Sequence, residues 1–226
     1  MMTLPDIQFS HDLEYGARLS CTGEQRFEFG SDPANTLSTA GINSVGNYNC
    51  IRLGGQAICW GHGGQGQLGQ DSSIHLGDDA GEISTVEPIS FEGTEHVIQI
   101  TGSYEHSCAL FADGKVRCWG YNNNARLGIG STGGIIGSAA GHMTTLSAIN
   151  FAEPTVRAVN IASGGNHNCV LFENGRIRCF GYSSYGQLGY GSTSLVGNSG
   201  GAAGMLTIPY IDFSDQSIPA KQVRLA

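Results

Sequence analysis

Cysteine is the residue type whose number and spacing in this chain could do chemistry. Six of the seven cysteines fall in pairs whose members lie nine or ten positions apart. Such pairs could form disulfides, bind a metal or remain buried as free thiols. Zinc is disfavoured, because the Cys-x2-Cys spacing is absent and each pair offers only two thiolates. The pairs are Cys50 with Cys59, Cys108 with Cys118, and Cys169 with Cys179.

A β-hairpin is predicted between the two members of each pair. The turns at 112–114 and 173–175 are three-residue loops ending in glycine, and residues 54–55 form a two-residue Gly-Gly loop. Counting back from each turn places the paired cysteines opposite each other at a non-hydrogen-bonded position. The Cα atoms of such a pair are about 4.5 Å apart, a distance that a disulfide can bridge. The pattern therefore favours three disulfides, and disulfides imply an oxidising compartment. The odd cysteine, Cys21, is expected to link another chain or to be a free thiol.

The three hairpins belong to an internal repeat. The segment 108–120 recurs at 169–181 and, one residue shorter, at 50–61. The first cysteines of successive copies lie 58 and 61 positions apart, a period long enough for a four-stranded unit. The repeat predicts an array of small antiparallel sheets. The last strand of each unit is expected at 88–91, 148–151 and 209–213.

The order of motifs in each unit resembles the regulator of chromosome condensation repeat family over roughly residues 42–226. The motifs are an apolar strand, His-x-Cys-x-Leu, Cys-Trp-Gly and Gly-Gln-Leu-Gly, complete at 66–69 and 186–189. The resemblance implies an all-β fold in which β-propeller blades of four antiparallel strands form an incomplete or partial propeller within one chain. Propellers of this family serve as exchange factors for small GTPases, as secreted inhibitors and as interaction platforms, so the resemblance implies fold more than activity.

The repeat predicts where the units begin and end. Strand-like segments near both ends, 4–9 and 222–226, would leave open sheet edges, which native proteins pair, cap or close. The ends could meet within one chain or between chains head-to-tail, or the chain could be a fragment of a longer propeller. Assembly between chains, as a homo-oligomer or filament, is favoured. The expected units are a partial preceding blade strand plus linker or insertion at 1–41, blades at 42–91, 92–151 and 152–213, and the opening strand of a further blade at 214–226.

The histidines of the repeat invite a catalytic interpretation, but Tyr48 stands where His106 and His167 stand in the other units. A structural hydrogen bond to a neighbouring turn is therefore favoured. No Ser-His-Asp order, phosphate-binding loop or paired-carboxylate motif is present, so neither an enzyme nor a cofactor is predicted. The aromatic residue after each second cysteine is expected to pack the blade rather than form a ligand cage: Trp60, Trp119 and Phe180.

Three long loops, 70–86, 129–147 and 190–207, are the best candidates for binding a protein partner. The first carries carboxylates that could hold calcium through oxygen ligands, although the spacing is not that of an EF-hand and a solvated acidic turn is favoured. No other metal site is predicted. The other two loops are neutral, and their apolar pairs could be buried against a neighbouring subunit. The candidate loop residues are Asp78, Asp79, Glu82, Ile135, Ile136, Leu195 and Val196.

Composition narrows the function further. The 35 glycines among 226 residues, with only 13% charged residues, predict many turns and few helices. The net charge is −8 and the basic residues are scattered, which disfavours nucleic acid as a partner. No apolar stretch approaches the ~20 residues of a membrane helix, so membrane insertion is not predicted. No signal peptide is visible, which leaves processing, export by another route, or a cytoplasmic location.

The leading hypothesis is a non-catalytic protein-interaction or structural module that is extracellular or at the cell surface and self-assembles through its half-blades. An exchange-factor-like or chromatin-associated propeller in the cytoplasm, with reduced thiols, is the first alternative. A secreted protein that binds and inhibits an enzyme is the second.

Overall fold

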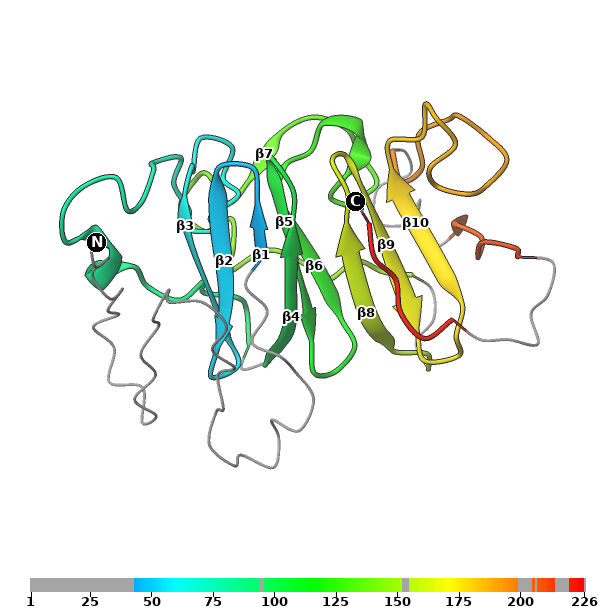
Figure 1. The fold of residues 1–226 in the computed structure, drawn as a ribbon, viewed down its shortest axis with the longest axis horizontal. Helices are drawn as coiled ribbons and strands as arrows, with labels where there is room; N and C mark the ends of the chain where they lie inside the picture. The colour runs from blue at the N-terminus through cyan, green and yellow to red at the C-terminus, as the bar shows by residue number, and fades with distance from the viewer. Residues whose placement is uncertain are drawn as a thin grey trace, which may run out of the picture.

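The computed structural model describes residues 43–93, 96–151, 155–198, 205, 207–213 and 220–225. Three antiparallel sheets stand side by side, and the strand axes of one sheet are roughly aligned with those of the next (Figure 1). The all-β partial propeller expected from the sequence is confirmed. Blade one contains β1 (Asn43–Val45), β2 (Tyr48–Leu53) and β3 (Gln56–Gly61). Blade two contains β4 (Val97–Gly102), β5 (His106–Phe111), β6 (Val116–Tyr121) and β7 (Ile135–Ile136), and blade three contains β8 (Ala158–Ser163), β9 (His167–Phe172) and β10 (Ile177–Gly181).

The predicted hairpin register is confirmed in all three blades. Leu53 pairs with Gln56 across the Gly54-Gly55 turn. In the longer turns, the amide of Phe111 donates to the Lys115 carbonyl at 2.9 Å, and Phe172 donates to Arg176 in the same way. The turn length thus sets the register, which explains why the cysteine spacing differs by one residue between blades. The resulting partners are Cys50 and Cys59, Cys108 and Cys118, and Cys169 and Cys179.

The outer edge of each blade differs from the expectation. The segments 88–91, 148–151 and 209–213 do not form strands. Each donates one backbone hydrogen bond to the start of the third strand: Ile89 to Ala57, Ile149 to Val116, and Ile211 to Ile177. The far end of that strand pairs instead with a residue inside the long loop, as β7 in blade two and as single bridges Gly61–Leu76 and Gly181–Val196 in the others. Because two segments share one edge, neither is long enough for a full ladder.

The core lies between neighbouring sheets rather than within one. Trp119 and Phe180 are fully buried there, which confirms their predicted packing role, and Trp60 is half-buried. Phe91 packs edge-on against Phe111 and Trp119, and Phe151 does the same against Phe172. The short 3-10 helices η2 (Glu82–Thr85) and η3 (Asn123–Ala125) lie in the loops.

Candidate interaction surfaces

The cysteine pairs lie where the two strands of each hairpin approach most closely. Their Cα atoms are 4.0–4.1 Å apart. All six side chains are buried. The sulfur atoms lie at bonding distance, 2.03 Å for Cys50 and Cys59, 2.09 Å for Cys108 and Cys118, and 1.95 Å for Cys169 and Cys179. Cys21 lies outside the described residues.

A chain of buried polar groups joins blade one to blade two. The hydroxyl of Tyr48 donates to the carbonyl of His106 at 2.6 Å and lies 2.8 Å from Ser107 Oγ. Ser107 Oγ in turn donates to the carbonyl of Gln67 at 2.9 Å, and Trp119 Nε1 donates to the same carbonyl at 3.0 Å. Burial raises the pKa of Tyr48, so its hydroxyl stays protonated and remains a donor.

The same arrangement joins blade two to blade three. His106 Nε2 lies 3.0 Å from Asn168 Oδ1, and Asn168 Nδ2 donates to the carbonyl of Arg126 at 2.6 Å. Burial lowers the pKa of His106 to about 3, so its ring is a neutral donor with a structural role, as predicted. His167, the third member of the series, is half-buried. Burial lowers its pKa as well.

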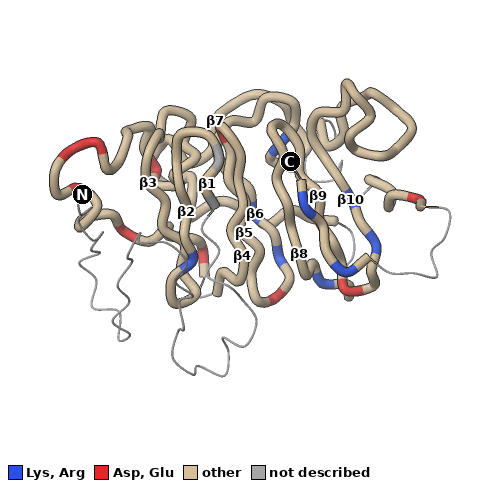
Figure 2. The backbone as a smooth tube through the Cα atoms, in the orientation of Figure 1, with Lys and Arg blue, Asp and Glu red and all other residues tan. Residues whose placement is uncertain are grey.

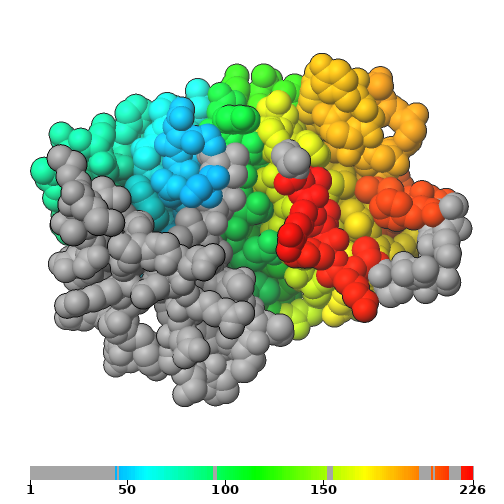
Figure 3. All heavy atoms as spheres, viewed as in Figure 1, coloured from blue at the N-terminus to red at the C-terminus, as the bar shows by residue number. Residues whose placement is uncertain are grey.

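The first strand of a blade is also held to the preceding blade by two kinds of hydrogen bond, one from a backbone amide to a side-chain oxygen and one between backbone groups. Gln99 Oε1 accepts a bond from the amide of Ile161 at 3.1 Å, and Asn160 Oδ1 accepts one from Val223 at 3.1 Å. The other contact runs to a hairpin-turn glycine: Val97 to Gly55 (2.8 Å), Ala158 to Gly114 (3.3 Å) and Ala220 to Gly175 (3.1 Å). Segment 220–225 therefore repeats both contacts that β8 makes with blade two, and the turn contact that β4 makes with blade one. Its atoms lie across those of blade three in Figure 3.

The long loops are tied to the blades. Ile136 and Val196 pack against apolar clusters of this chain. Ile135 and Leu195 are half-buried, and their contact with a neighbouring subunit stays a prediction. Sequence reasoning missed Asp71, which lies at a left-handed φ of 52°. Its two carboxylate oxygens accept bonds from the amides of Gly141 and Met143, both at 2.8 Å, so the first loop holds the second.

The acidic residues of the first loop stabilise their own turn. The Glu82 carboxylate accepts bonds from the amides of Gly77 at 2.7 Å and Asp79 at 3.2 Å, and these bonds lower its pKa. Within the described part of the chain, no three His, Cys, Asp or Glu side chains are grouped to share a metal ion. No helix in that part is both long enough and apolar enough to cross a membrane.

Sequence reasoning also missed a group of basic and aromatic residues at one end of blade three. Blade one carries half of the described acids, whereas Lys and Arg concentrate toward blade three (Figure 2). Aligning the repeats would have shown where blade three departs from blade two. The members of the group are Arg157, Arg176, Tyr210, Phe213 and Lys221.

Sheets that repeat in sequence and pack face to face through recurring hydrogen bonds define a repeat-propeller protein. A family model for the Regulator of chromosome condensation (RCC1) repeat matches residues 54–110, and a second model of this repeat matches 97–126 and 158–187. The human protein Regulator of chromosome condensation is 30% identical over 158 residues, which cover 69% of this chain and 33% of that protein. The chain belongs to this repeat family.

Two solved structures share the fold. Human WBSCR16 aligns with a TM-score of 0.56 at 18% identity, covering 76% of this chain and 39% of that one. Yeast RCC1 (Prp20), solved bound to Kap60, aligns with a TM-score of 0.51 at 22% identity, covering 71% of this chain and 34% of that one. The chain spans a third or less of the length of the curated relatives it matches, and only 2% of human E3 ubiquitin-protein ligase HERC2.

Proposed function

We propose that this chain is a non-catalytic, protein-binding part of a propeller and that it joins a second copy head-to-tail through the exposed face of blade three. Segment 220–225 is then the opening strand of a further blade. The supporting observation is that this segment repeats both of the contacts by which blade three holds blade two, one of which blade two also makes to blade one. The half-buried ring of His167 is a candidate donor to the rest of that blade, because His106 bonds Asn168 from the same position.

The charge distribution supports head-to-tail contact. Residues 1–95 contain thirteen Asp and Glu against three Arg, whereas residues 96–226 contain six Asp and Glu against eight Lys and Arg. In the described part, the acids lie toward blade one and the basic residues toward blade three (Figure 2). Opposite charge at the two ends of the row attracts the tail of one copy to the head of the next and repels head-to-head contact.

Native mass spectrometry and light scattering of the purified chain test this assembly. We expect dimers or larger species at micromolar concentration. Val223→Asp places a charge where a half-buried side chain packs against blade three and should shift the chain toward monomer. Tyr104→Ser is the matched control, because Tyr104 is 65% exposed on a loop of blade two. A strictly monomeric native chain, or equal loss of assembly in both variants, would contradict the proposal.

We further propose that the chain works in an oxidising environment, outside the cell or at its surface. The three pairs of sulfur atoms at bonding distance support this. Thiol titration of the native protein, denatured without reductant, should find at most one reactive thiol, that of Cys21. Seven reactive thiols would instead favour the alternative that the family resemblance implies, an intracellular exchange-factor-like or chromatin-associated propeller.

A further inference from the structure

The hairpin turn of blade three lacks a charge that the turn of blade two has. In blade two, Lys115 Nζ lies 2.7 Å from Asp113 Oδ2, so the turn neutralises its own cation. In blade three, Asn174 stands at the position of Asp113, and Arg176 at that of Lys115. Both turns keep the same backbone bond, Lys115 N to Asp113 Oδ1 at 3.0 Å and Arg176 N to Asn174 Oδ1 at 3.1 Å. The asparagine therefore preserves the turn while leaving the cation without a carboxylate.

An aromatic ring holds this cation in place. The guanidinium of Arg176 lies 3.9 Å from the ring centroid of Tyr210, and that of Arg178 lies 4.2 Å from the same centroid. Phe172 meets the ring edge-on at 5.8 Å, which fixes its orientation. Blade two has Ala148 at the position of Tyr210. Stacking on a ring orients a guanidinium without neutralising its charge, so Arg176 is pre-organised for a further anionic partner.

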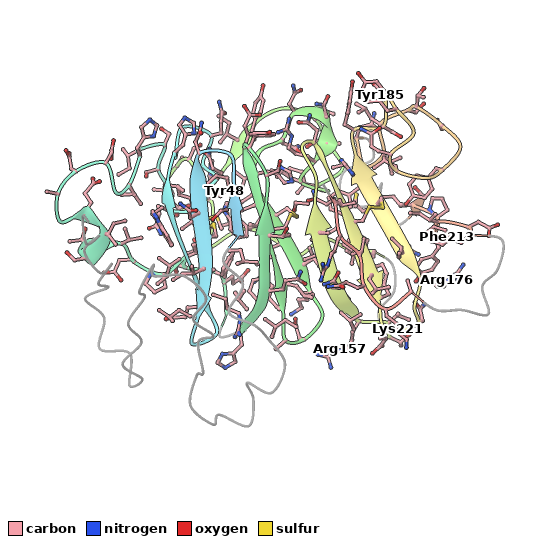
Figure 4. The ribbon with its side chains drawn as sticks, viewed as in Figure 1. Tyr48, Arg157, Arg176, Tyr185, Phe213 and Lys221 are labelled. Carbon is pink, nitrogen blue, oxygen red and sulfur yellow. A yellow bond between two sulfur atoms is a disulfide. The ribbon has the colours of Figure 1, made fainter. Side chains whose placement is uncertain are left out.

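Two more exposed cations lie at the same end of blade three. Figure 4 shows Arg157, Arg176 and Lys221 along this end, with Phe213 on the adjoining segment. None of the three cations forms an ion pair with a carboxylate among the described residues. The acids of the described part of blade three are Glu173, whose carboxylate accepts the Arg157 amide at 3.0 Å, and Asp212. Phe213 is 62% exposed and adds an apolar contact.

We propose that this basic-aromatic surface, made of Arg157, Arg176, Tyr210, Phe213 and Lys221, binds an acidic segment of a partner protein. Arg presents parallel donors that match the two oxygens of a carboxylate. Nucleic acid fits less well, because its affinity depends on many phosphate contacts and this chain carries a net charge of −8. This proposal rests on the proposed protein-binding function but does not require head-to-tail assembly. The acidic-segment site and the assembly can therefore each be refuted without the other.

Fluorescence anisotropy with a labelled peptide of alternating glutamate and glycine tests the site on the full chain. A peptide with glutamine in place of glutamate is the neutral probe. We expect at least about tenfold tighter binding of the acidic peptide, weakening as salt shortens the screening length. Arg176→Ala and Lys221→Ala should each weaken binding about two- to fivefold, as for exposed ion pairs. Arg176→Lys should give an intermediate loss, because it keeps the charge but not the planar stack.

Lys115→Ala is the matched control, since it removes a cation from the equivalent turn that Asp113 already neutralises. It should leave the affinity unchanged. An equal loss in Lys115→Ala, or equal binding of the neutral peptide, would overturn the proposal. Equal affinity for single-stranded DNA with the same dependence on Arg176 would overturn the acidic-peptide assignment in favour of a general polyanion site. Should Arg176→Ala lower the melting temperature, Lys221→Ala on the exposed terminal segment decides the outcome.

Discussion

His106 is buried without charge between blades two and three, and acid should therefore destabilise the protein through this residue. Its side chain is fully buried, and Nδ1 has no hydrogen-bond partner within the described structure. The pKa is lowered to about 3, mainly by burial; the bond to Asn168 opposes the shift, and the positive charge of Arg126 adds to it. A proton that binds the unfolded chain near pH 6.5 is thus excluded from the folded state.

The size of the effect follows from the difference between the two pKa values. Between about pH 6.5 and pH 3 the unfolded chain binds a proton at this residue and the folded chain does not. Stability is therefore fully present above pH 6.5 and falls as pH falls through this window. At about 1.4 kcal/mol for each pH unit, lowering the pH from about 7 to about 4.5 should cost ~3 kcal/mol.

Urea unfolding across this pH range, followed by tryptophan fluorescence without reductant, measures the effect. His106→Gln keeps a donor for Asn168 and removes the titrating ring, so it should lower stability at neutral pH but flatten the pH dependence. Groups that titrate in both proteins, including His167, cancel in the comparison. His96→Gln is the control, because His96 is exposed, and its pH dependence should match that of the native protein. Parallel losses in native protein and His106→Gln would refute the reasoning.

Two further substitutions test the contacts between blades. Tyr48→Phe removes the donor to the His106 carbonyl at 2.6 Å and should cost about 1–2 kcal/mol in urea unfolding; an unchanged midpoint would show that the bond adds nothing. Asp71→Asn keeps a side chain that tolerates left-handed backbone but loses the charge on two bonds of 2.8 Å, and should cost about 1–3 kcal/mol. Faster hydrogen exchange at the amides of Gly141 and Met143 would locate the second loss, and unchanged exchange there would contradict it.

The hairpins could be predicted from the sequence because their geometry is local. A turn of two or three residues with glycine fixes the register, and the register places the cysteines opposite each other. The outer edge could not be predicted in the same way. Segments 88–91 and 148–151 have the composition of strands, but Leu76 competes with the first for β3 and Ile136 competes with the second for β6. The sequence of either segment alone does not show that two segments compete for the same strand edge.

Contacts between loops and blades were missed for a related reason. Asp71 lies 70 and 72 positions from its partners Gly141 and Met143, and a single aspartate in a glycine-rich loop carries no sign of where its oxygens point. The basic residues at the end of blade three are likewise scattered along the chain. Their gathering depends on stacking blades at the repeat period, so a search for a continuous basic stripe does not find them.

Comparing the repeats with one another separates architecture from function better than reading any one of them. Gln67 and Arg126 occupy the same repeat position, and their carbonyls accept equivalent bonds from Ser107 and Asn168. The side chain differs because the backbone makes the contact, so this position is architectural. Blade three breaks the pattern at Asn174 and Tyr210, yet its turn keeps the same backbone bond as blade two. A change that leaves the hydrogen bonds of the turn intact but places an exposed cation on an aromatic ring marks the surface where a partner should be sought.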